Sequence, residues 1–454
     1  MSVSSLLSAQ RGYFRSGATL PLPARKRALR ALLRQVTLQE GALLAALRED
    51  LGKARFEGYM TEVGLVKDEL RFHLKHLDRW AAGRRVPTPP AQFPGRSRIR
   101  PEPLGAVLIM APWNYPVQLS LEPLIGALSA GNCAVLKPSA YAPASSRALA
   151  KLISGALPPE LAAVAEGGRE ENQALLEQKF DYIFFTGSVS VGRYVMEKAA
   201  RHLTPVTLEL GGKSPCIVTP SAHLRTAARR IAFGKLLNAG QTCVAPDYLL
   251  VHESVKDRLI PLLEEAFAEF LGPNPLSNPD YPRIVNQKHL ERLTGLLEGE
   301  RVLFGGQTEG LRIAPTLLDC ADGDAPVMQE EIFGPILPLL TYRSLEQALD
   351  FIRDRPRPLA LYLFTQNKKE EEAVFSGASF GGGCVNDTVV HLATPHMPFG
   401  GVGESGMGAC HGKASFDTFS HYKSVLKKSA LPDPPVRYHP YTPGKEKLLR
   451  LFLR

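Results

Sequence analysis

The chain has 454 residues, enough for two or three domains, and it is 44% hydrophobic and 22% charged, as in an ordinary soluble globular protein. No apolar run approaches the ~18 residues of a membrane span, and the N-terminus lacks the basic start and long apolar stretch of a secretory signal. The formal net charge is +9, but the Lys and Arg residues are spread out without interleaved aromatics, which argues against a nucleic-acid partner.

The first 80 residues are predicted to form helices. Apolar residues recur there with the 3.6-residue period of one helix face, first at Leu29, Leu32, Leu33 and Val36, and again at Val63, Val66, Leu70, Leu74 and Leu77. Residues 84–106 then hold six prolines. Because proline lacks the backbone donor and fixes φ, this stretch is predicted to be a linker or an extended arm.

Five short apolar runs follow, and each ends in polar or glycine residues. They are AVLIM before APWNYP, CAVL before KPS, AAVA before EGG, YIFF before TGS, and VTLEL before GGKS. Helix-forming stretches lie between most of them, which predicts a parallel sheet covered on both faces. Ligands bind beyond the carboxyl ends of such strands, so the pattern predicts a nucleotide-binding α/β domain.

The strand and helix alternation continues from about residue 209 to 392, which predicts a second α/β domain. The stretch PFGGVGESGMG, residues 398–408, is too rich in glycine for a regular element. The chain ends in KEKLLRLFLR, an amphipathic segment that could associate weakly with a membrane surface. More often such a tail is solvated or docked, so membrane contact is not expected.

One of the six cysteines stands out by its surroundings. Cys243 lies in NAGQTCVAP, residues 238–246, between the apolar segments IAFGKLL and YLLV. A reactive thiolate needs a polar, partly open setting, which these neighbours would supply. None of the six forms a CxxC pair, so no zinc or other metal site is expected, and scattered single cysteines favour the reducing cytoplasm.

Three other motifs are weaker. GSVSVG, residues 187–192, lacks the central glycine of the dinucleotide fingerprint, and GGKS at 211–214 lacks the first glycine of a phosphate-binding loop, where Thr207 stands instead. GASFG at 377–381 matches the nucleophile elbow of hydrolases by letter, with Ser379 at its centre. The elbow needs a strand before it and a helix after it, and the sequence predicts the reverse order.

The combination of motifs is more specific than any one of them. APWNYP, KPS, FTGS, LELGGKSP, GQTC, EEIFGP and PFGGVGESGMG occur in that order. With these motifs the sequence resembles the aldehyde dehydrogenase superfamily, and HLTPVTLELGGKSPC and GQTCVAPDY are most similar to its class 3 branch. The resemblance extends from about residue 10 to 427.

The resemblance implies catalytic roles for three residues. Cys243 would attack the aldehyde carbon to form a thiohemiacetal, and Asn114 in PWNYP, together with the Cys243 backbone N–H, would bind the oxyanion. After hydride transfer to the nicotinamide, Glu209 in LELGG would activate the water that hydrolyses the thioester to a carboxylic acid. From the residues alone, Asn114 could equally be a turn residue and Glu209 a solvent-facing strand residue.

The same resemblance implies a set of cofactor contacts. Lys137 would reach the adenosine ribose, Glu331 would hold the nicotinamide ribose with Phe333 packed near it, and the turn at FTGS would bring a helix terminus to the pyrophosphate. Trp113 would shape the pocket, although it could equally be a core residue. The implied cofactor-binding residues are Trp113, Lys137, Gly187, Ser188, Gly192, Glu331 and Phe333.

One position departs from the family pattern. Class 3 sequences usually read KPSE, where the glutamate binds the ribose hydroxyls of NAD and would repel the 2′-phosphate of NADP. Here Ala140 occupies that position. The substitution predicts use of both NAD and NADP, although a side chain from elsewhere in the chain could replace the glutamate.

The expected architecture is a Rossmann-like cofactor domain from residues 1–83 and 107–208, a catalytic α/β domain at 209–392, bridging segments at 84–106 and 393–430, and a C-terminal tail at 431–454. The bridging segments imply a homodimer. The expected function is NAD(P)-dependent oxidation of an aldehyde. The alternatives are transfer of the thioester to coenzyme A, which Glu209 argues against, a non-catalytic protein on the same scaffold, and a cysteine hydrolase, for which no local signature surrounds Cys243.

Overall fold

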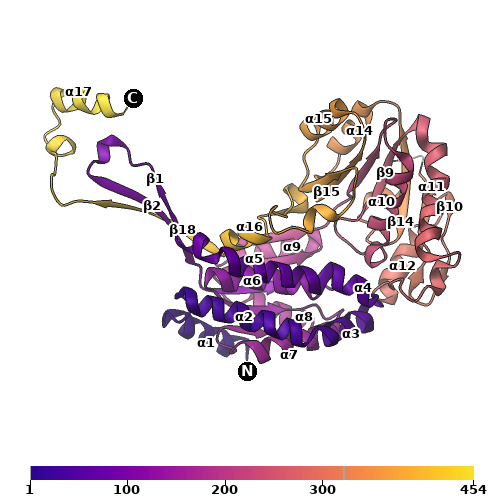
Figure 1. The fold of residues 1–454 in the computed structure, drawn as a ribbon, viewed down its shortest axis with the longest axis horizontal. Coiled ribbons are helices and arrows are strands. Elements are labelled where there is room, and N and C mark those ends of the chain that lie inside the picture. The colour runs from indigo at the N-terminus through magenta and orange to yellow at the C-terminus, as the bar shows by residue number, and fades with distance from the viewer. Residues whose placement is uncertain (1, 321–322, 454) are drawn as a thin grey trace.

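A computed structural model describes residues 2–320 and 323–453. The chain forms two α/β units, each built on a mostly parallel sheet, and a thin antiparallel arm that projects from them (Figure 1). The predicted α/β class, with a parallel-sheet first domain, a second α/β domain and a small arm, is confirmed. None of the helices in the described residues is long and apolar enough to cross a membrane.

All five predicted apolar runs form strands of the first sheet, and they pair with one another in parallel. The order across this sheet is β17 (Gly406–Met407), β7 (Val206–Leu210), β6 (Tyr182–Gly187), β3 (Ala106–Met110), β4 (Cys133–Lys137) and β5 (Ala162–Val164). Every residue of β3 is buried because successive side chains enter two different cores. Ala106, Leu108 and Met110 pack into one core, and Val107 and Ile109 into the other.

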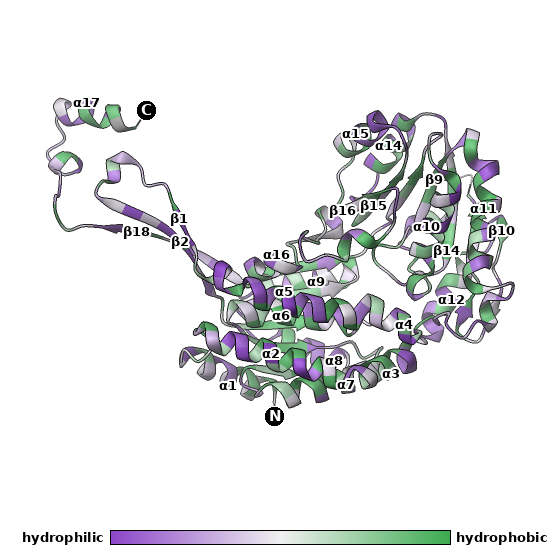
Figure 2. Ribbon diagram, viewed as in Figure 1, coloured by the Kyte–Doolittle hydropathy of each residue, from purple (hydrophilic) through white to green (hydrophobic). Residues whose placement is uncertain are grey.

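Helices cover both faces of this sheet. The face shared with Val107 carries α6 (Gln118–Ala130) and α7 (Pro143–Ala156), over which lie α2 (Leu22–Leu38), α3 (Glu40–Leu51) and α5 (Gly64–Ala81). The opposite face carries α1 (Val3–Arg15), α8 (Arg169–Leu176) and α9 (Val189–Ala200). The helices predicted in the first 80 residues are confirmed, and their apolar stripes face the core. Figure 2 shows hydrophobic residues concentrated along the strands of the body.

The second sheet begins at Pro215, after the chain leaves β7. Its order is β10 (Val302–Phe304), β13 (Thr316–Asp319), β14 (Ile336–Tyr342), β9 (Tyr248–His252), β8 (Pro215–Val218), β15 (Ala360–Phe364) and β16 (Gly382–Val385), and only β10 runs antiparallel to its neighbour. The helices of this unit include α10 (Leu224–Leu236), α11 (Glu253–Leu271), α12 (Gln287–Gly295), α14 (Leu345–Arg353) and α15 (Lys368–Gly377). The boundary expected at residue 209 therefore falls inside β7, so Glu209 belongs to the first sheet.

The glycine-rich stretch 398–408 is more regular than predicted. Gly406 and Met407 form β17, which pairs antiparallel with Glu209 and Leu208 of β7. The prediction that no regular element forms here is wrong at these two residues, because Gly406 lets the backbone approach closely. A Cβ on Gly406 would lie 2.2 Å from the Leu208 carbonyl oxygen. GASFG follows α15 and precedes β16, which is the order opposite to a nucleophile elbow.

The proline-rich stretch is an arm and not a linker. β2 (Gly95–Pro103) is the central strand of the arm. It pairs antiparallel with β1 (Arg84–Val86) on one side and, over nine residues, with β18 (Ser420–Lys428) on the other. This three-stranded sheet extends away from the body, and α17 (Pro443–Phe452) lies beyond it near the C-terminus (Figure 1). Few apolar residues pack against the faces of this three-stranded sheet. Phe93, Val425 and Leu426 are exposed on the arm.

Candidate active site

Three separate segments converge where the two units meet. β7 carries Glu209, the loop after β3 carries Asn114, and the loop after α10 carries Cys243. Cys243 and Glu209 line the same small cavity, and Cys243 also lines a larger pocket beside it. The residues of the predicted catalytic set therefore lie within one region.

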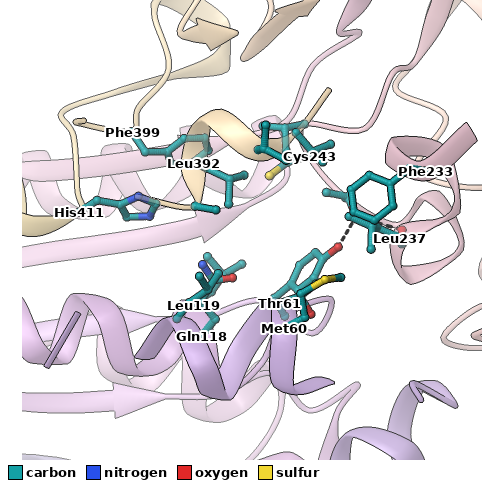
Figure 3. A pocket seen from close by; sticks show the side chains of 17 residues that line it. Met60, Thr61, Gln118, Leu119, Phe233, Leu237, Cys243, Leu392, Phe399 and His411 are labelled. Atoms are coloured by element: carbon teal, nitrogen blue, oxygen red, sulfur yellow. Dashed lines mark hydrogen bonds between the residues drawn. The ribbon is translucent and has the colours of Figure 1, made fainter. Parts of the chain in front are cut away.

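The larger pocket is almost wholly apolar. Figure 3 shows Cys243 facing it, with Leu392, Phe399 and His411 on one side and Phe233 and Leu237 on another. The remaining lining residues are Met60, Thr61, Leu65, Tyr115, Gln118, Leu119, Thr242, Val244, Val389, Val390 and Ala393. A site of this composition binds an apolar molecule and excludes water.

The Cys243 loop is held in an unusual backbone conformation. Asn238, Ala239 and Gly240 have φ values of 51°, 52° and 73°. Position 240 requires glycine because the backbone there passes close to the Gly334 carbonyl oxygen. A Cβ on Gly240 would lie 2.2 Å from that oxygen. The loop therefore needs its glycine for packing against the neighbouring backbone.

Gln241, two residues before Cys243, has a structural role. Gln241 is fully buried, and its side chain donates to the carbonyls of Asn238 (2.9 Å) and Arg283 (3.0 Å) and accepts from the Val285 N–H (3.0 Å). The prediction of an open polar setting is wrong in this respect, because the polar side chain satisfies buried backbone groups. Within GQTC, only Cys243 is partly accessible.

The surroundings of Cys243 disfavour its thiolate. Burial, followed by the charges of Glu331 and Glu209, raises the pKa of the Cys243 thiol to about 12. The backbone N–H groups of Cys243 and Val244 act in the opposite direction and lower this pKa. The thiol is therefore protonated at neutral pH in the structure described here.

Glu209 is the most isolated acid of the site. It is 3% exposed, and neither carboxylate oxygen has a hydrogen-bond partner among residues 2–320 and 323–453. Burial raises the pKa of Glu209 well above its ordinary value. The Glu209 carboxyl is titratable, lies in the same cavity as a cysteine and has no hydrogen-bond partner among the described residues. It is therefore suited to exchange a proton with a substrate or a water molecule.

Asn114 joins the loop after β3 to the Cys243 loop. Its side-chain Nδ2 donates to the Gln241 carbonyl at 3.0 Å, and its own carbonyl accepts from Asn238 Nδ2 at 2.8 Å. Next to it, the Tyr115 hydroxyl lies 2.6 Å from Thr242 Oγ1. The amide is thus fixed beside the residues that precede Cys243.

The turn after β6 has the form expected of an anion-binding helix start. Gly187 ends the strand, and the Ser188 side chain caps α9 by accepting from the Val191 N–H at 3.5 Å. Gly192 also has a packing role within the first unit. A Cβ there would lie 2.6 Å from Leu210 Cδ2, so Gly192 lets α9 pack against β7.

Lys137 is the last residue of β4, and its ammonium group already donates two hydrogen bonds within the protein. Its Nζ donates to the carbonyls of Pro138 (2.7 Å) and Gly167 (2.6 Å), and the residue is 2% exposed. Burial lowers the pKa of Lys137, whereas the charges of Glu171 and Glu166 raise it. A ligand hydroxyl reaching this ammonium group would have to share it with these carbonyls.

Glu331 and Phe333 lie on the other side of the cleft. Glu331 Oε1 has no hydrogen-bond partner, and burial raises the pKa of Glu331 to about 8, opposed in part by the Gly212 N–H. Phe333 has a φ of 52° and meets the Trp113 ring edge-on at a centroid distance of 5.4 Å. The ring contact gives Trp113 a structural role at the mouth of the cleft.

A large cavity lies beside the start of α9 and reaches Glu331. It has a volume of about 760 Å³ and runs from Val189 and Ser190 of α9 past Gly211 and Gly212 to Glu331. Free amides of a helix start favour a phosphate group, and the partnerless Glu331 oxygen can accept a hydroxyl hydrogen. Lys137 does not line this cavity. In the described residues no group of three or more His, Cys, Asp or Glu side chains could hold a metal ion.

Sequence reasoning missed several residues of the pocket. His411, with a φ of 74°, lines it with its Nε2 3.1 Å from Glu122 Oε2. Burial lowers the pKa of His411, but Glu122 and Glu69 outweigh burial and raise it above its ordinary value. No local pattern joins positions this far apart in the chain, so only the fold could reveal them.

Known proteins resemble this chain over its whole length. The aldehyde dehydrogenase family profile matches residues 2–425. The chain is 49% identical to 4,4′-diaponeurosporen-aldehyde dehydrogenase of Staphylococcus aureus, over 98% of this chain and 97% of that protein. It is 48% identical to aldehyde dehydrogenase family 3 member H1 of Arabidopsis thaliana, over 99% and 94%.

Solved structures agree with the sequence comparison. The substrate-bound state of Staphylococcus aureus AldH superposes with a TM-score of 0.98 at 48% identity, covering 100% of both chains. An NADP complex of glyceraldehyde-3-phosphate dehydrogenase GapN from Methanocaldococcus jannaschii superposes with a TM-score of 0.84 at 26% identity, covering 94% of each chain.

The raised pKa of Cys243 predicts its reactivity. In the cofactor-free protein, alkylation of Cys243 by iodoacetamide should rise about tenfold per pH unit from pH 7 to 10 without levelling off, because only the thiolate reacts. Peptide mass spectrometry would follow Cys243 separately from the half-buried Cys384, and Cys243→Ser supplies the blank. A plateau below pH 9 would contradict the buried, protonated thiol.

Proposed function

The chain belongs to the aldehyde dehydrogenase family, and on that premise we propose that Cys243, Asn114 and Glu209 oxidise an aldehyde to a carboxylic acid through a cysteine thioester. The observation that carries the proposal is the shared cavity of Cys243 and Glu209, in which the carboxylate has no protein partner. A structural glutamate in a buried site would be hydrogen-bonded.

The first step is addition of the Cys243 sulfur to the aldehyde carbon. The thiol first releases its proton to water. The S–C bond then forms as the carbonyl π bond breaks, and the oxygen takes the negative charge. The Cys243 backbone N–H and Asn114 Nδ2 donate to that oxyanion. Asn114 Nδ2 already donates one hydrogen to the Gln241 carbonyl, two residues before Cys243, and its second hydrogen is left for the oxyanion. Protonation of Glu209 and Glu331, whose charges raise the Cys243 pKa, favours the thiolate that reacts.

NAD or NADP, when bound, supplies the hydride acceptor. The residues of this chain hold it in place: the start of α9 at Gly187 and Ser188 receives the pyrophosphate, and Glu331 receives the nicotinamide ribose. Lys137 contributes to the adenosine side. Phe333 and Trp113 pack at the nicotinamide end, where their rings exclude water.

Hydrolysis of the thioester needs a base. Glu209, once ionised, takes a proton from a water molecule that attacks the thioester carbon, and the Cys243 sulfur leaves as the acid forms. Burial raises the pKa of Glu209 well above its ordinary value, so the carboxylate, once formed, is a stronger base than an exposed one. An enzyme that passed its thioester to coenzyme A would not need this base.

The pocket supports an apolar substrate. Aliphatic and aromatic side chains surround Cys243, and the similar protein from Staphylococcus aureus is named for a diaponeurosporen aldehyde. We infer that this enzyme takes aldehydes with an apolar substituent of medium or greater length. Its scattered single cysteines favour the cytoplasm as its compartment.

The two half-reactions can be separated by one substitution. In Glu209→Gln, release of the acid should slow about 10²-fold or more while reduction of the cofactor stays fast, because the substitution removes the base and not the nucleophile. Stopped-flow absorbance should show a burst of reduced cofactor followed by a slow steady state. Cys243→Ala is the control, and it should show neither phase.

Loss of the burst in Glu209→Gln, with both half-reactions equally slowed, would assign Glu209 another main role. Turnover retained in Cys243→Ala, with the other five cysteines untouched, would contradict the nucleophile.

Ala140 predicts use of both cofactors, with NADP at least comparable to NAD. The substitution Ala140→Glu should lower kcat/KM for NADP about tenfold, because a carboxylate would repel the 2′-phosphate. Glu166 is the side chain that could replace the missing glutamate, since it follows β5, the strand beside β4, and its charge acts on Lys137.

Kinetics with each cofactor in the native enzyme, Ala140→Glu and Glu166→Gln would test this choice. A hundredfold native preference for NAD, or an unchanged NADP value in Ala140→Glu, would refute dual use. A large gain for NADP in Glu166→Gln would identify Glu166 as the discriminating acid.

We propose that the arm joins two copies into a homodimer. A three-stranded sheet without a core beneath it is not stable in water by itself, and β18 is an edge strand with unpaired backbone groups. Phe93 is 72% exposed, and Val425 and Leu426 are 43% and 45% exposed. A second copy covering this sheet would bury all three.

Light scattering at micromolar concentration should therefore give the mass of a dimer. The double substitution Phe93→Ser with Val425→Ser should weaken the dimer at least tenfold, since it removes apolar area from the interface. Leu203→Ser, at a residue 91% exposed in the loop after α9, is the matched control and should leave the mass unchanged. A fully active native monomer would contradict the proposal.

A further inference from the structure

Two charged side chains lie buried beneath the Asn114 loop, and no step above uses them. Lys53 Nζ and Glu62 Oε1 are 2.6 Å apart, and both side chains are 0% exposed. Lys53 also donates to the Asn114 carbonyl at 2.8 Å and lies 3.8 Å from the centre of the Tyr115 ring. A buried ammonium group is tolerated when each of its donors has a partner, and here there are three.

Glu62 reaches the other end of the same loop. Its Oε2 accepts from the N–H groups of Val117 (2.8 Å) and Gln118 (3.3 Å), where α6 begins. No side chain at the N-cap position, Val117, caps this helix. A carboxylate suits the positive end of a helix, so Glu62 takes the place of the cap.

The chain adopts a rare backbone form to place this carboxylate. Arg55–Gly58 is α-helical, Tyr59–Val63 is a single π-helical turn, and α5 follows directly. Such a turn inserts one residue into a helix and is often found at functional sites. Glu62 lies within the turn, between residues that line the apolar pocket and the buried start of α5.

The ion pair therefore holds the loop at two points, one on each side of Pro116. Lys53 holds the Asn114 carbonyl, which Asn238 of the Cys243 loop also contacts, and Glu62 holds the start of α6. Between these points stand the Asn114 amide and the Tyr115 ring, whose hydroxyl contacts Thr242. Rotation of the loop would move the Asn114 amide away from Cys243.

We propose that Lys53 and Glu62 are positioning residues that act through Asn114, by holding its side-chain amide where the oxyanion forms. The inference rests on the oxyanion role proposed for Asn114. It goes beyond that role because neither Lys53 nor Glu62 lines the apolar pocket or touches the reacting atoms. A displacement of about 1 Å in a catalytic group can cost ~10²-fold in rate, so the effect on turnover should be large.

The experiment measures hydride transfer in the full-length enzyme. Lys53→Met should lower kcat 10- to 100-fold and leave the KM for the cofactor within about threefold, since the cofactor cleft is formed by other elements. An aldehyde deuterated at the carbonyl carbon should show a larger isotope effect in Lys53→Met than in the native enzyme, because hydride transfer from the oxyanion, the step that breaks the C–D bond, becomes limiting. A loss of stability alone would not raise the isotope effect of the folded enzyme.

A double-substitution cycle tests the route through Asn114. In an Asn114→Ala background, Lys53→Met should lower kcat by less than threefold, because its effect has no amide left to act through. Lys67→Met is the matched control, since it breaks the largely buried Lys67–Glu40 pair on the neighbouring helix without touching the Asn114 loop. Its kcat and isotope effect should be native.

If Lys53→Met does not fold, Glu62→Gln and the double variant Lys53→Met with Glu62→Met replace it, because removing both charges avoids an unpaired buried ion. Native kcat and isotope effect in a folded Lys53 or Glu62 variant would overturn the inference, as would losses that multiply fully in the Asn114→Ala background. Full activity in Asn114→Ala alone would overturn the oxyanion role itself, which distinguishes the two failures.

Discussion

The site depends on one network of buried hydrogen bonds between two loops, one from each α/β unit. The Gln241 carbonyl accepts from the side chains of Asn114 and Asn238, and the Asn114 carbonyl accepts from Asn238 and Lys53. These bonds join the loop after β3 of the first sheet to the loop before β9 of the second. Because they lie in the interior, each lost partner would leave a costly unsatisfied group, so the two loops keep a fixed relation.

Burial then sets the chemistry. The pKa of Cys243 rises to about 12, that of Glu331 to about 8, and that of Glu209 well above its ordinary value, in each case mainly through desolvation. Burial thus disfavours the charged forms of the proposed nucleophile Cys243, of the proposed base Glu209 and of Glu331. The apolar pocket beside Cys243 adds to the burial that disfavours the Cys243 thiolate.

The sequence predicted those features that short patterns determine. Continuous apolar runs identified the five parallel strands from Ala106 to Leu210, and ordered motifs identified Cys243 and Glu209, which do share a cavity. The close packing of Gly192 on Leu210 was not predicted, because a glycine at a helix start can serve packing or ligand binding and the sequence does not distinguish them. The Lys53–Glu62 pair was not predicted at all, since nothing local distinguishes a buried charge from an exposed one on a helix.

The most direct test of the account is chemical identification of the covalent intermediate. The native enzyme, mixed with cofactor and an apolar aldehyde, would be quenched with acid within the first turnover and digested for peptide mass spectrometry. The account predicts an acyl group, two hydrogens lighter than the added aldehyde would be as a thiohemiacetal, on the peptide that contains Cys243. Acylation of a different residue, or acid formed with no acyl-enzyme at any quench time, would contradict it.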